Sequence, residues 1–220
     1  VIGAGNFARA VLLPELKKLS GVTLHTIATK RGASADHSQE RFGFYHATTD
    51  EAAVLDNADI NAVLIATRHD SHAALTAAAL KAGQSVLVEK PLGLTTEEIT
   101  RIQEARASSD GFFQIGFNRR FAPLAQQAQA ALAKFEGPRF MVLRINAGNV
   151  PGDSWLHNRE EGGGRIIGEM CHFIDLARYF AGSPIVSVQA DAARNQTGAA
   201  DDVTATLRFQ NGSLATIAYT

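Results

Sequence analysis

The sequence predicts an α/β protein with a doubly wound parallel sheet, followed by a smaller α+β domain with an open, mostly antiparallel sheet. Its first half alternates short apolar runs with helical patterns, which is typical of parallel strands joined by right-handed crossovers. Its second half ends in a hairpin pattern around Asn211–Gly212, with alternating apolar residues in both arms. The expected domains are therefore residues 1–118 and residues 119–220.

Composition excludes several classes of protein. The chain has 220 residues, 45% of them hydrophobic and 20% charged, values that are ordinary for a globular protein with a real core. A formal net charge of -1 gives no basic field for nucleic acid or an anionic membrane, and no apolar run is long enough to span a bilayer. Cys171 is the only cysteine, which fits a reducing compartment and predicts a cytoplasmic location.

The first-half elements follow in order along the chain. β-branched or apolar runs predict strands that end at residue 2 and then cover 22–29, 60–67, 85–89 and 112–117. Helical spacing predicts helices over 6–19, over 71–83 and from 95 to about 109. Gly83 is expected just past the end of the second helix, and Thr95 with Glu98 has the spacing of a capping box.

The second half is expected to contain both helices and strands, with mostly antiparallel pairing. Residues 120–135 predict a helix with Pro123 near its start, and 139–148 predict a strand. The segment "GGGRIIGEMCHFIDLARYFAG" predicts a helix with two faces. Its apolar face consists of Met170, Phe173, Ile174 and Ala177, and its ionisable face consists of Glu169, His172 and Asp175.

The turn "GAGNFA" at residues 3–8 predicts a dinucleotide site of the Rossmann type. Gly3 permits the tight turn, Gly5 lets a pyrophosphate approach the backbone, and Ala8 replaces the third glycine where helix and strand pack closely. The N–H groups of the following helix, including Asn6 and Phe7, then face the anion. The alternative is a plain turn, which the position at the head of repeated β–α units disfavours.

The end of the second strand bears on which dinucleotide binds. An acidic residue there would hold the ribose 2′-hydroxyl of NAD, but the strand ends Thr29-Lys30-Arg31 and the first acid is Asp36. The two cations would pair with a 2′-phosphate, so the sequence favours NADP, with NAD possible. The alternative is that Lys30 and Arg31 are solvated loop charges.

Polar residues follow two further strands, where ligands of open α/β sheets bind. "TRHDSH" ends the strand before residue 67 and "EKP" ends the strand before residue 89. A lysine beside a cationic nicotinamide should find its charged form disfavoured, which would let Lys90 exchange a proton. The alternative is a lysine that merely reaches solvent. The predicted cofactor contacts at these ends are Thr67, His69, His72, Glu89, Lys90 and Pro91.

These motifs together resemble one family. The glycine turn, the run "T…H…AL.AG…V..EKPL" and the later "GGG…H..D" resemble the Gfo/Idh/MocA (glucose–fructose oxidoreductase/inositol dehydrogenase) oxidoreductases over essentially the whole chain. "GFNRRFAP", "NAG…PGDSW" and "GGGRIIGEMCHFID" are more similar to the branch found fused behind a zinc-dependent dehydrogenase domain. A chain that starts in mid-strand suits such a fusion, and the resemblance implies a sheet that continues beyond residue 220, so the C-terminus also looks trimmed.

The resemblance implies NAD(P)-dependent hydride transfer at a carbinol or keto carbon of a sugar, cyclitol or nucleotide sugar. It makes Lys90 and His172 the catalytic residues, implies a cis Lys90–Pro91 bond, and implies a homo-oligomer. Many relatives have an aspartate where this chain has Gly168, which weakens the usual histidine relay and makes Lys90 the main acid/base. The expected substrate contacts are Asn118, Arg119, Asn146, Trp155, His157, Arg165, Glu169 and Asp175.

The sequence is also compatible with three other interpretations of these residues. His172 could be a packing histidine, and Cys171 is expected to be a structural thiol. The chain could be a dinucleotide-binding sensor or scaffold without turnover, which the glycine at position 168 motivates. Glu169 and His172 have a Glu-x-x-His spacing used in di-iron bundles, but one copy without a bundle pattern argues against a metal, and none is expected.

Overall fold

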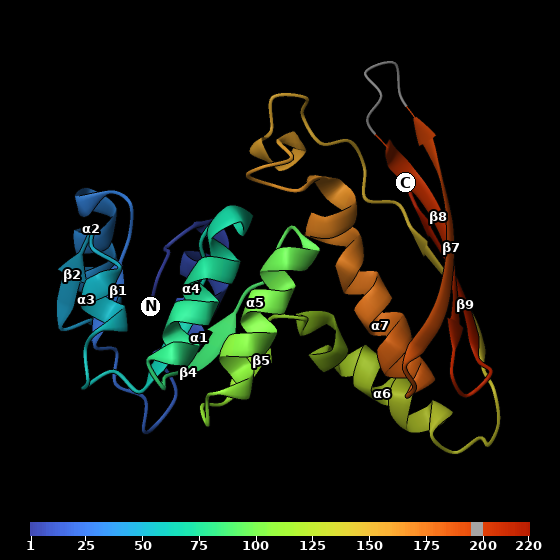
Figure 1. Cartoon of the computed structure of the whole chain (residues 1–220), viewed down its shortest axis with the longest axis horizontal. Helices are drawn as coiled ribbons and strands as arrows, with labels where there is room; N and C mark the ends of the chain where they lie inside the picture. Colours follow the sequence, from blue (N-terminus) through green and yellow to red (C-terminus); the bar gives the residue numbers. More distant parts are fainter. Residues whose placement is uncertain (195–199) are drawn as a thin grey trace. The chain divides into compact units, whose positions relative to one another are not determined.

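The computed structural model describes residues 1–194 and 200–220, and the chain divides into two compact units, Val1–Gly116 and Phe117–Thr220 (Figure 1). The predicted boundary lies two residues further along, after residue 118. Within the described ranges, no helix is both long and apolar enough to cross a membrane.

The first unit is built on a parallel sheet. β1 (Thr26–Ala28) pairs with β2 (His46–Thr48), and β4 (Ser85–Val88) pairs with β3 (Ala62–Ile65) on one side and β5 (Phe113–Ile115) on the other. Ile2 joins the two groups, because it bridges to both Ala28 and Ile65. The resulting order, β2–β1–Ile2–β3–β4–β5, is that of a doubly wound sheet, so the predicted fold class of this half is confirmed.

The helices of the first unit include two that were not predicted from the sequence, at residues 32–42 and 52–55. They are η1 (Ala8–Leu12), α1 (Leu13–Leu16), α2 (Gly32–Phe42), α3 (Ala52–Leu55), α4 (His69–Lys81) and α5 (Thr96–Ala107). α2 escaped prediction because its buried side chains, Ala35, Ser38 and Phe42, are mostly small or polar. η1 is a π-helical turn that precedes Pro14, a residue without the N–H that a regular α-turn uses.

Two predicted helix signals are confirmed. Thr95 and Glu98 form a complete capping box, in which each side chain accepts a hydrogen bond from the other residue's backbone N–H. Gly83 follows the last residues of α4 with a left-handed φ of 77°. The capping box fixes where the loop after β4 enters α5, and Gly83 fixes where the chain leaves α4 on its way to β4.

The second unit carries a four-stranded sheet in the order β6–β9–β8–β7. β8 (Ala200–Phe209) runs antiparallel to β7 (Ile185–Arg194) and to β9 (Leu214–Tyr219), whereas β6 (Phe140–Ile145) runs parallel to β9. The mostly antiparallel sheet and the hairpin between β8 and β9 confirm the prediction, and Gly212 supplies a turn with φ of 82°.

One long helix packs on this sheet, as Figure 1 shows for α7, drawn in orange. η4 (Ile166–Met170) leads directly into α7 (Cys171–Ala181). Met170 and Ala177 are buried against the sheet, and Phe173 and Ile174 pack at the margin of the same core, so the predicted apolar face is confirmed. The remaining helices of this unit are η2 (Asn118–Phe121), α6 (Pro123–Leu132) and η3 (Trp155–His157).

Candidate functional site

Three chain segments meet at the carboxyl edge of the first unit's sheet. The N–H of Gly3 donates to the carbonyl of Ala28 over 2.9 Å, and the N–H of Glu89 donates to that of Ile65 over 2.9 Å. Because all the strands are parallel, the residues that follow them emerge at one edge. We call this edge the rim and define it as residues 3–8, 67–72 and 89–91.

The glycine turn has the shape that a dinucleotide needs. Gly3 has a φ of 96°, and a Cβ there would lie 2.4 Å from the carbonyl oxygen of Ala66, so only glycine fits. A Cβ at Gly5 would meet nothing within 4 Å, which leaves open space where a pyrophosphate would approach the backbone. Ala8 is only 1% exposed, as expected for the position that replaces the third glycine.

The residues around this turn are accessible. Asn6 and Phe7 are exposed at the start of the first helix, and the Asn6 Oδ1 accepts a hydrogen bond from Arg9 over 3.1 Å. Lys30 and Arg31 are likewise exposed, in the short loop between β1 and α2. The Thr29 hydroxyl donates to the carbonyl of Arg31 over 2.7 Å and closes that loop. Lys30 and Arg31 therefore follow β1, the second strand along the chain, and the loop between β1 and α2 contains no acidic residue.

The EKP corner follows β4. The Lys90–Pro91 peptide bond is cis, as predicted. The Lys90 side chain is half-buried at the rim, and the Glu89 carboxyl lies so close to Gly116 that a Cβ there would be 2.8 Å from Oε1. Burial raises the pKa of Glu89, although the neighbouring Lys90 charge opposes that rise.

Two histidines of α4 stand behind this corner and are buried, with exposed fractions of 8% for His69 and 1% for His72. The His72 Nδ1 lies 2.7 Å from the carbonyl oxygen of Pro91, and its Nε2 lies 3.3 Å from that of Thr67. Burial lowers the pKa of His72, and this effect outweighs the two carbonyls, which raise it. The ring is therefore neutral near pH 7 and lies between two segments of the rim.

The second unit holds the other predicted catalytic residue. His172 is 8% exposed in the first turn of α7, with its ring centroid 6.1 Å from that of Phe117. One turn further on, Asp175 accepts two hydrogen bonds from Arg120, one of them over 3.0 Å from Nε. The guanidinium of Arg119 lies 4.4 Å from the Phe173 ring centroid. Asp175 thus has a structural partner within its own unit.

Arg165 and Glu169 form a cluster with Tyr219 of β9. The Arg165 Nε lies 3.3 Å from Glu169 Oε2, and its Nη2 lies 3.1 Å from the Tyr219 hydroxyl, which itself donates to Glu169. The Arg165 side chain is only 4% exposed. This cluster ties η4 to the sheet and fixes the start of the helix that carries His172.

The same cluster predicts an alkaline transition. Burial, followed by the Glu169 carboxylate, raises the pKa of Tyr219 from 10.0 to about 12. The folded state holds the neutral phenol, so this contribution to stability is complete below pH 10 and is lost as the pH rises toward 12. Tyrosinate absorbance should show an ionisation step near pH 12 that Tyr219→Phe removes; an unchanged absorbance titration in Tyr219→Phe above pH 10 would contradict the cluster.

The remaining predicted substrate contacts are spread over the second unit. Asn118 is exposed in η2, and the Asn146 Oδ1 accepts from the Thr220 hydroxyl over 3.3 Å. Trp155 and His157 form the ends of η3, where a Cβ on Gly162 would lie 2.5 Å from the backbone of Leu156. The first of the three glycines thus approaches its own chain closely. Their roles toward a substrate stay predictions.

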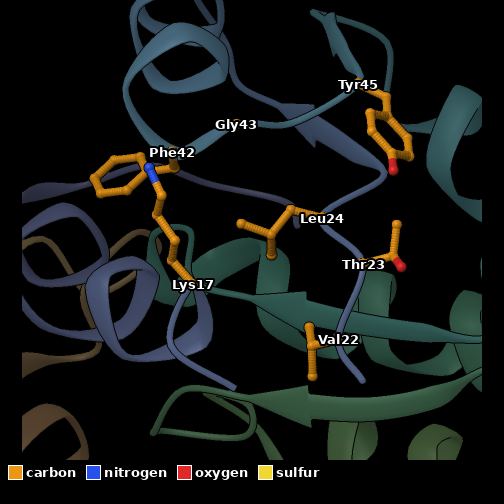
Figure 2. A pocket seen from close by; sticks show the side chains of 7 residues that line it. All are labelled: Lys17, Val22, Thr23, Leu24, Phe42, Gly43 and Tyr45. Atoms are coloured by element: carbon orange, nitrogen blue, oxygen red, sulfur yellow. The ribbon is translucent and has the colours of Figure 1, made fainter. Parts of the chain in front are cut away.

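A shallow pocket lies elsewhere in the first unit. It is lined by Lys17, Val22, Thr23, Leu24, Phe42, Gly43 and Tyr45, as Figure 2 shows. Residues 22–24 precede β1, so the pocket is at the amino end of that strand, away from the rim. Across the described residues, no group of three or more His, Cys, Asp or Glu side chains could hold a metal ion.

A doubly wound sheet with an open glycine turn at its carboxyl edge defines a dinucleotide-binding protein of the Rossmann type. Two family models match: the oxidoreductase family with an NAD-binding Rossmann fold over residues 1–117, and the GFO/IDH/MocA C-terminal domain over residues 129–220. The chain belongs to the Gfo/Idh/MocA oxidoreductase family.

Its relatives include sugar and inositol dehydrogenases. Myo-inositol 2-dehydrogenase of Thermotoga maritima is 28% identical over 99% of this chain and 66% of the relative. Inositol 2-dehydrogenase 2 of Saccharopolyspora erythraea is 32% identical over 77% of this chain and 50% of the relative. The chain thus spans about half to two thirds of the length of these proteins.

A solved structure agrees with the sequence matches. Levoglucosan dehydrogenase in complex with NADH and levoglucosan superposes with a TM-score of 0.86 at 26% identity, covering 100% of this chain and 65% of that one. That protein holds NADH and a sugar substrate.

Proposed function

We propose that the protein is an NAD(P)-dependent oxidoreductase that oxidises a carbinol, or reduces a keto carbon, of a sugar, cyclitol or nucleotide sugar. The observation that carries the proposal is the rim, where the open Gly5 turn follows Ile2 and the half-buried Lys90 follows β4, with β3 between them in one parallel sheet. The family and its dehydrogenase relatives support the reaction class.

In this reaction the glycine turn would bind the cofactor, and Lys90 would transfer the proton. Gly3, Gly5 and the N–H groups of the first helix would hold the pyrophosphate, and the bound nicotinamide supplies a hydride acceptor or donor at C4. In the oxidation, the carbinol C–H bond would break as hydride leaves, and the Lys90 amine would take the hydroxyl proton. The substrate becomes a carbonyl, and Lys90 becomes an ammonium that returns its proton to solvent.

His172 assists in this proposal, in a role that rests on the family resemblance. The aspartate that commonly orients the histidine is replaced by Gly168, and the Asp175 carboxylate accepts hydrogen bonds from Arg120. We therefore assign the main proton transfer to Lys90. Arg119 and the asparagines Asn118 and Asn146 are exposed and stay the proposed substrate contacts.

The proposal is tested by a screen of cyclitols, sugars and nucleotide sugars with NADP⁺ and NAD⁺, read as the absorbance of reduced nicotinamide. Turnover of any one of them supports an enzyme. Tight cofactor binding without turnover across the screen supports the second candidate, a dinucleotide-binding sensor or scaffold, which the missing aspartate at Gly168 favours. The proposed homo-oligomer and the upstream zinc-dependent dehydrogenase domain stay predictions.

We further propose that NADP is preferred, although levoglucosan dehydrogenase has been solved in complexes with NADH. Lys30 and Arg31 are exposed after β1, and charge-assisted hydrogen bonds to a 2′-phosphate should contribute about 1.5–3 kcal/mol. NADPH should therefore bind at least about tenfold more tightly than NADH in a fluorescence titration.

The double change Lys30→Gln with Arg31→Gln should bring the two affinities together by weakening NADPH alone. The matched control is Arg101→Gln, which removes an exposed arginine from α5 and should leave the ratio unchanged. Equal affinities in the unmodified protein, or a preference for NADH, would contradict the assignment of these two cations.

A further inference from the structure

We propose that His72 is a positioning residue: its imidazole donates from Nδ1 to the carbonyl of Pro91 and thereby holds the Lys90–Pro91 corner against α4. This inference rests on the proposed function, because it concerns how Lys90 is held for proton transfer. It also revises the expectation that His72 contacts the cofactor itself.

The geometry places the His72 ring between two rim segments. The Nδ1 atom lies 2.7 Å from the Pro91 oxygen, and the Nε2 atom lies 3.3 Å from the Thr67 oxygen. Pro91 and Thr67 follow the neighbouring parallel strands β4 and β3, and both lie beyond the last paired residues of those strands. The ring therefore lies between two loops at the point where the pairing of β3 with β4 has ended.

Burial makes this contact costly to lose. His72 is 1% exposed, so a carbonyl left without its donor could not turn to water. A neutral imidazole carries one N–H and can donate to only one of the two carbonyls. The shorter distance assigns that proton to Nδ1, directed at Pro91, and leaves the longer Thr67 contact without a donor.

The contact reaches the reacting residue through the backbone. Pro91 follows Lys90 directly and has no N–H, so its carbonyl is the backbone group through which it can form a hydrogen bond. Displacing that carbonyl would move the Lys90 amine, and a displacement of about 1 Å at a reacting group can cost about 10²-fold in rate. His72 would thus affect proton transfer without touching substrate or cofactor.

Three substitutions separate hydrogen bonding from packing. His72→Asn keeps a donor close to the Nδ1 position, His72→Gln keeps one close to Nε2, and His72→Leu fills space without any donor. We expect kcat of His72→Asn within about threefold of the unmodified protein, and a loss of about 10–10² in the other two. The Kd for NADPH should change by less than about threefold throughout.

The matched control is Thr76→Val, one turn further along α4. Thr76 is fully buried and its hydroxyl has no hydrogen-bond partner, so valine keeps the volume and removes nothing that binds. All rates are compared well below the melting temperature of the least stable variant. If leucine is tolerated as well as asparagine, or if stability falls while kcat is unchanged, His72 only packs or stabilises, and the inference is wrong.

A second readout needs no turnover and separates this inference from the proposed function. Nitrogen chemical shifts of labelled histidine report which ring nitrogen carries the proton. We expect Nδ1 of His72 to be protonated in the folded protein at neutral pH. A proton on Nε2 alone would overturn the inference even in an active enzyme, and a protonated Nδ1 in a protein without turnover would uphold the anchored corner while the proposed function fails.

Discussion

Lys90→Met should lower kcat by about 10²–10⁴-fold while the protein folds and binds NADPH as before, because a positioned acid/base group typically supplies a factor of that size. Methionine keeps the length of the half-buried side chain and removes only the amine. The loss should appear in kcat at saturating cofactor, since Lys90 acts on the substrate hydroxyl after binding. Lys81→Met, an exposed lysine at the end of α4, is the matched control and should leave kcat unchanged.

The ranking against His172→Asn tests the assignment of roles. His172→Asn should lower kcat less than Lys90→Met does. Gly168 stands where an orienting aspartate is usual, and Asp175 pairs with Arg120. A larger loss from His172→Asn at matched cofactor saturation would make the histidine the proton carrier. If neither variant lost activity in an active protein, the EKP corner would be structural.

The two glycines of the turn should respond in opposite ways to alanine. Gly3→Ala places a Cβ 2.4 Å from a backbone oxygen at a φ of 96°, so overpacking and backbone strain should together cost about 2–5 kcal/mol. In a chain of 220 residues this lowers the melting temperature by roughly 4–20 °C. A calorimetric scan measures it directly.

Gly5→Ala should leave the melting temperature nearly unchanged, because its Cβ would meet nothing within 4 Å. That methyl group would instead stand in the space of the pyrophosphate and weaken NADPH by at least about tenfold, or about 1.4 kcal/mol. Each variant serves as the other's control. A Gly5→Ala protein that binds NADPH normally would remove the turn from the cofactor site.

Local signals in the sequence predicted the rim well. Glycines, a capping box and a proline at a strand end act within a few residues, so "GAGNFA" and "EKP" could be interpreted without a fold. Gly3 in its left-handed turn and the cis bond before Pro91 are confirmed. The two faces of the helix around His172 were predictable for the same reason, because helical periodicity is local.

Contacts between distant residues could not be predicted this way. Arg120 reaches Asp175 across 55 positions, and Tyr219 joins Glu169 across 50, and neither pairing leaves a pattern in the sequence. These partners show that two of the carboxylates expected to contact substrate also have structural roles. His72 was predicted at the rim, but only the fold shows that its ring is directed at the backbone of Pro91.

The most direct test of the central claim, hydride transfer at the rim, follows the hydrogen itself. The protein is incubated with NADP⁺ and polyols deuterated at their carbinol carbons, myo-inositol and levoglucosan among them, and the reduced nicotinamide is analysed by mass spectrometry. The account predicts one deuterium at C4 for each nicotinamide reduced, with Lys90→Met slowing its appearance. A protein that binds NADP⁺ and transfers no deuterium from any of these compounds would contradict it and would support a dinucleotide-binding sensor.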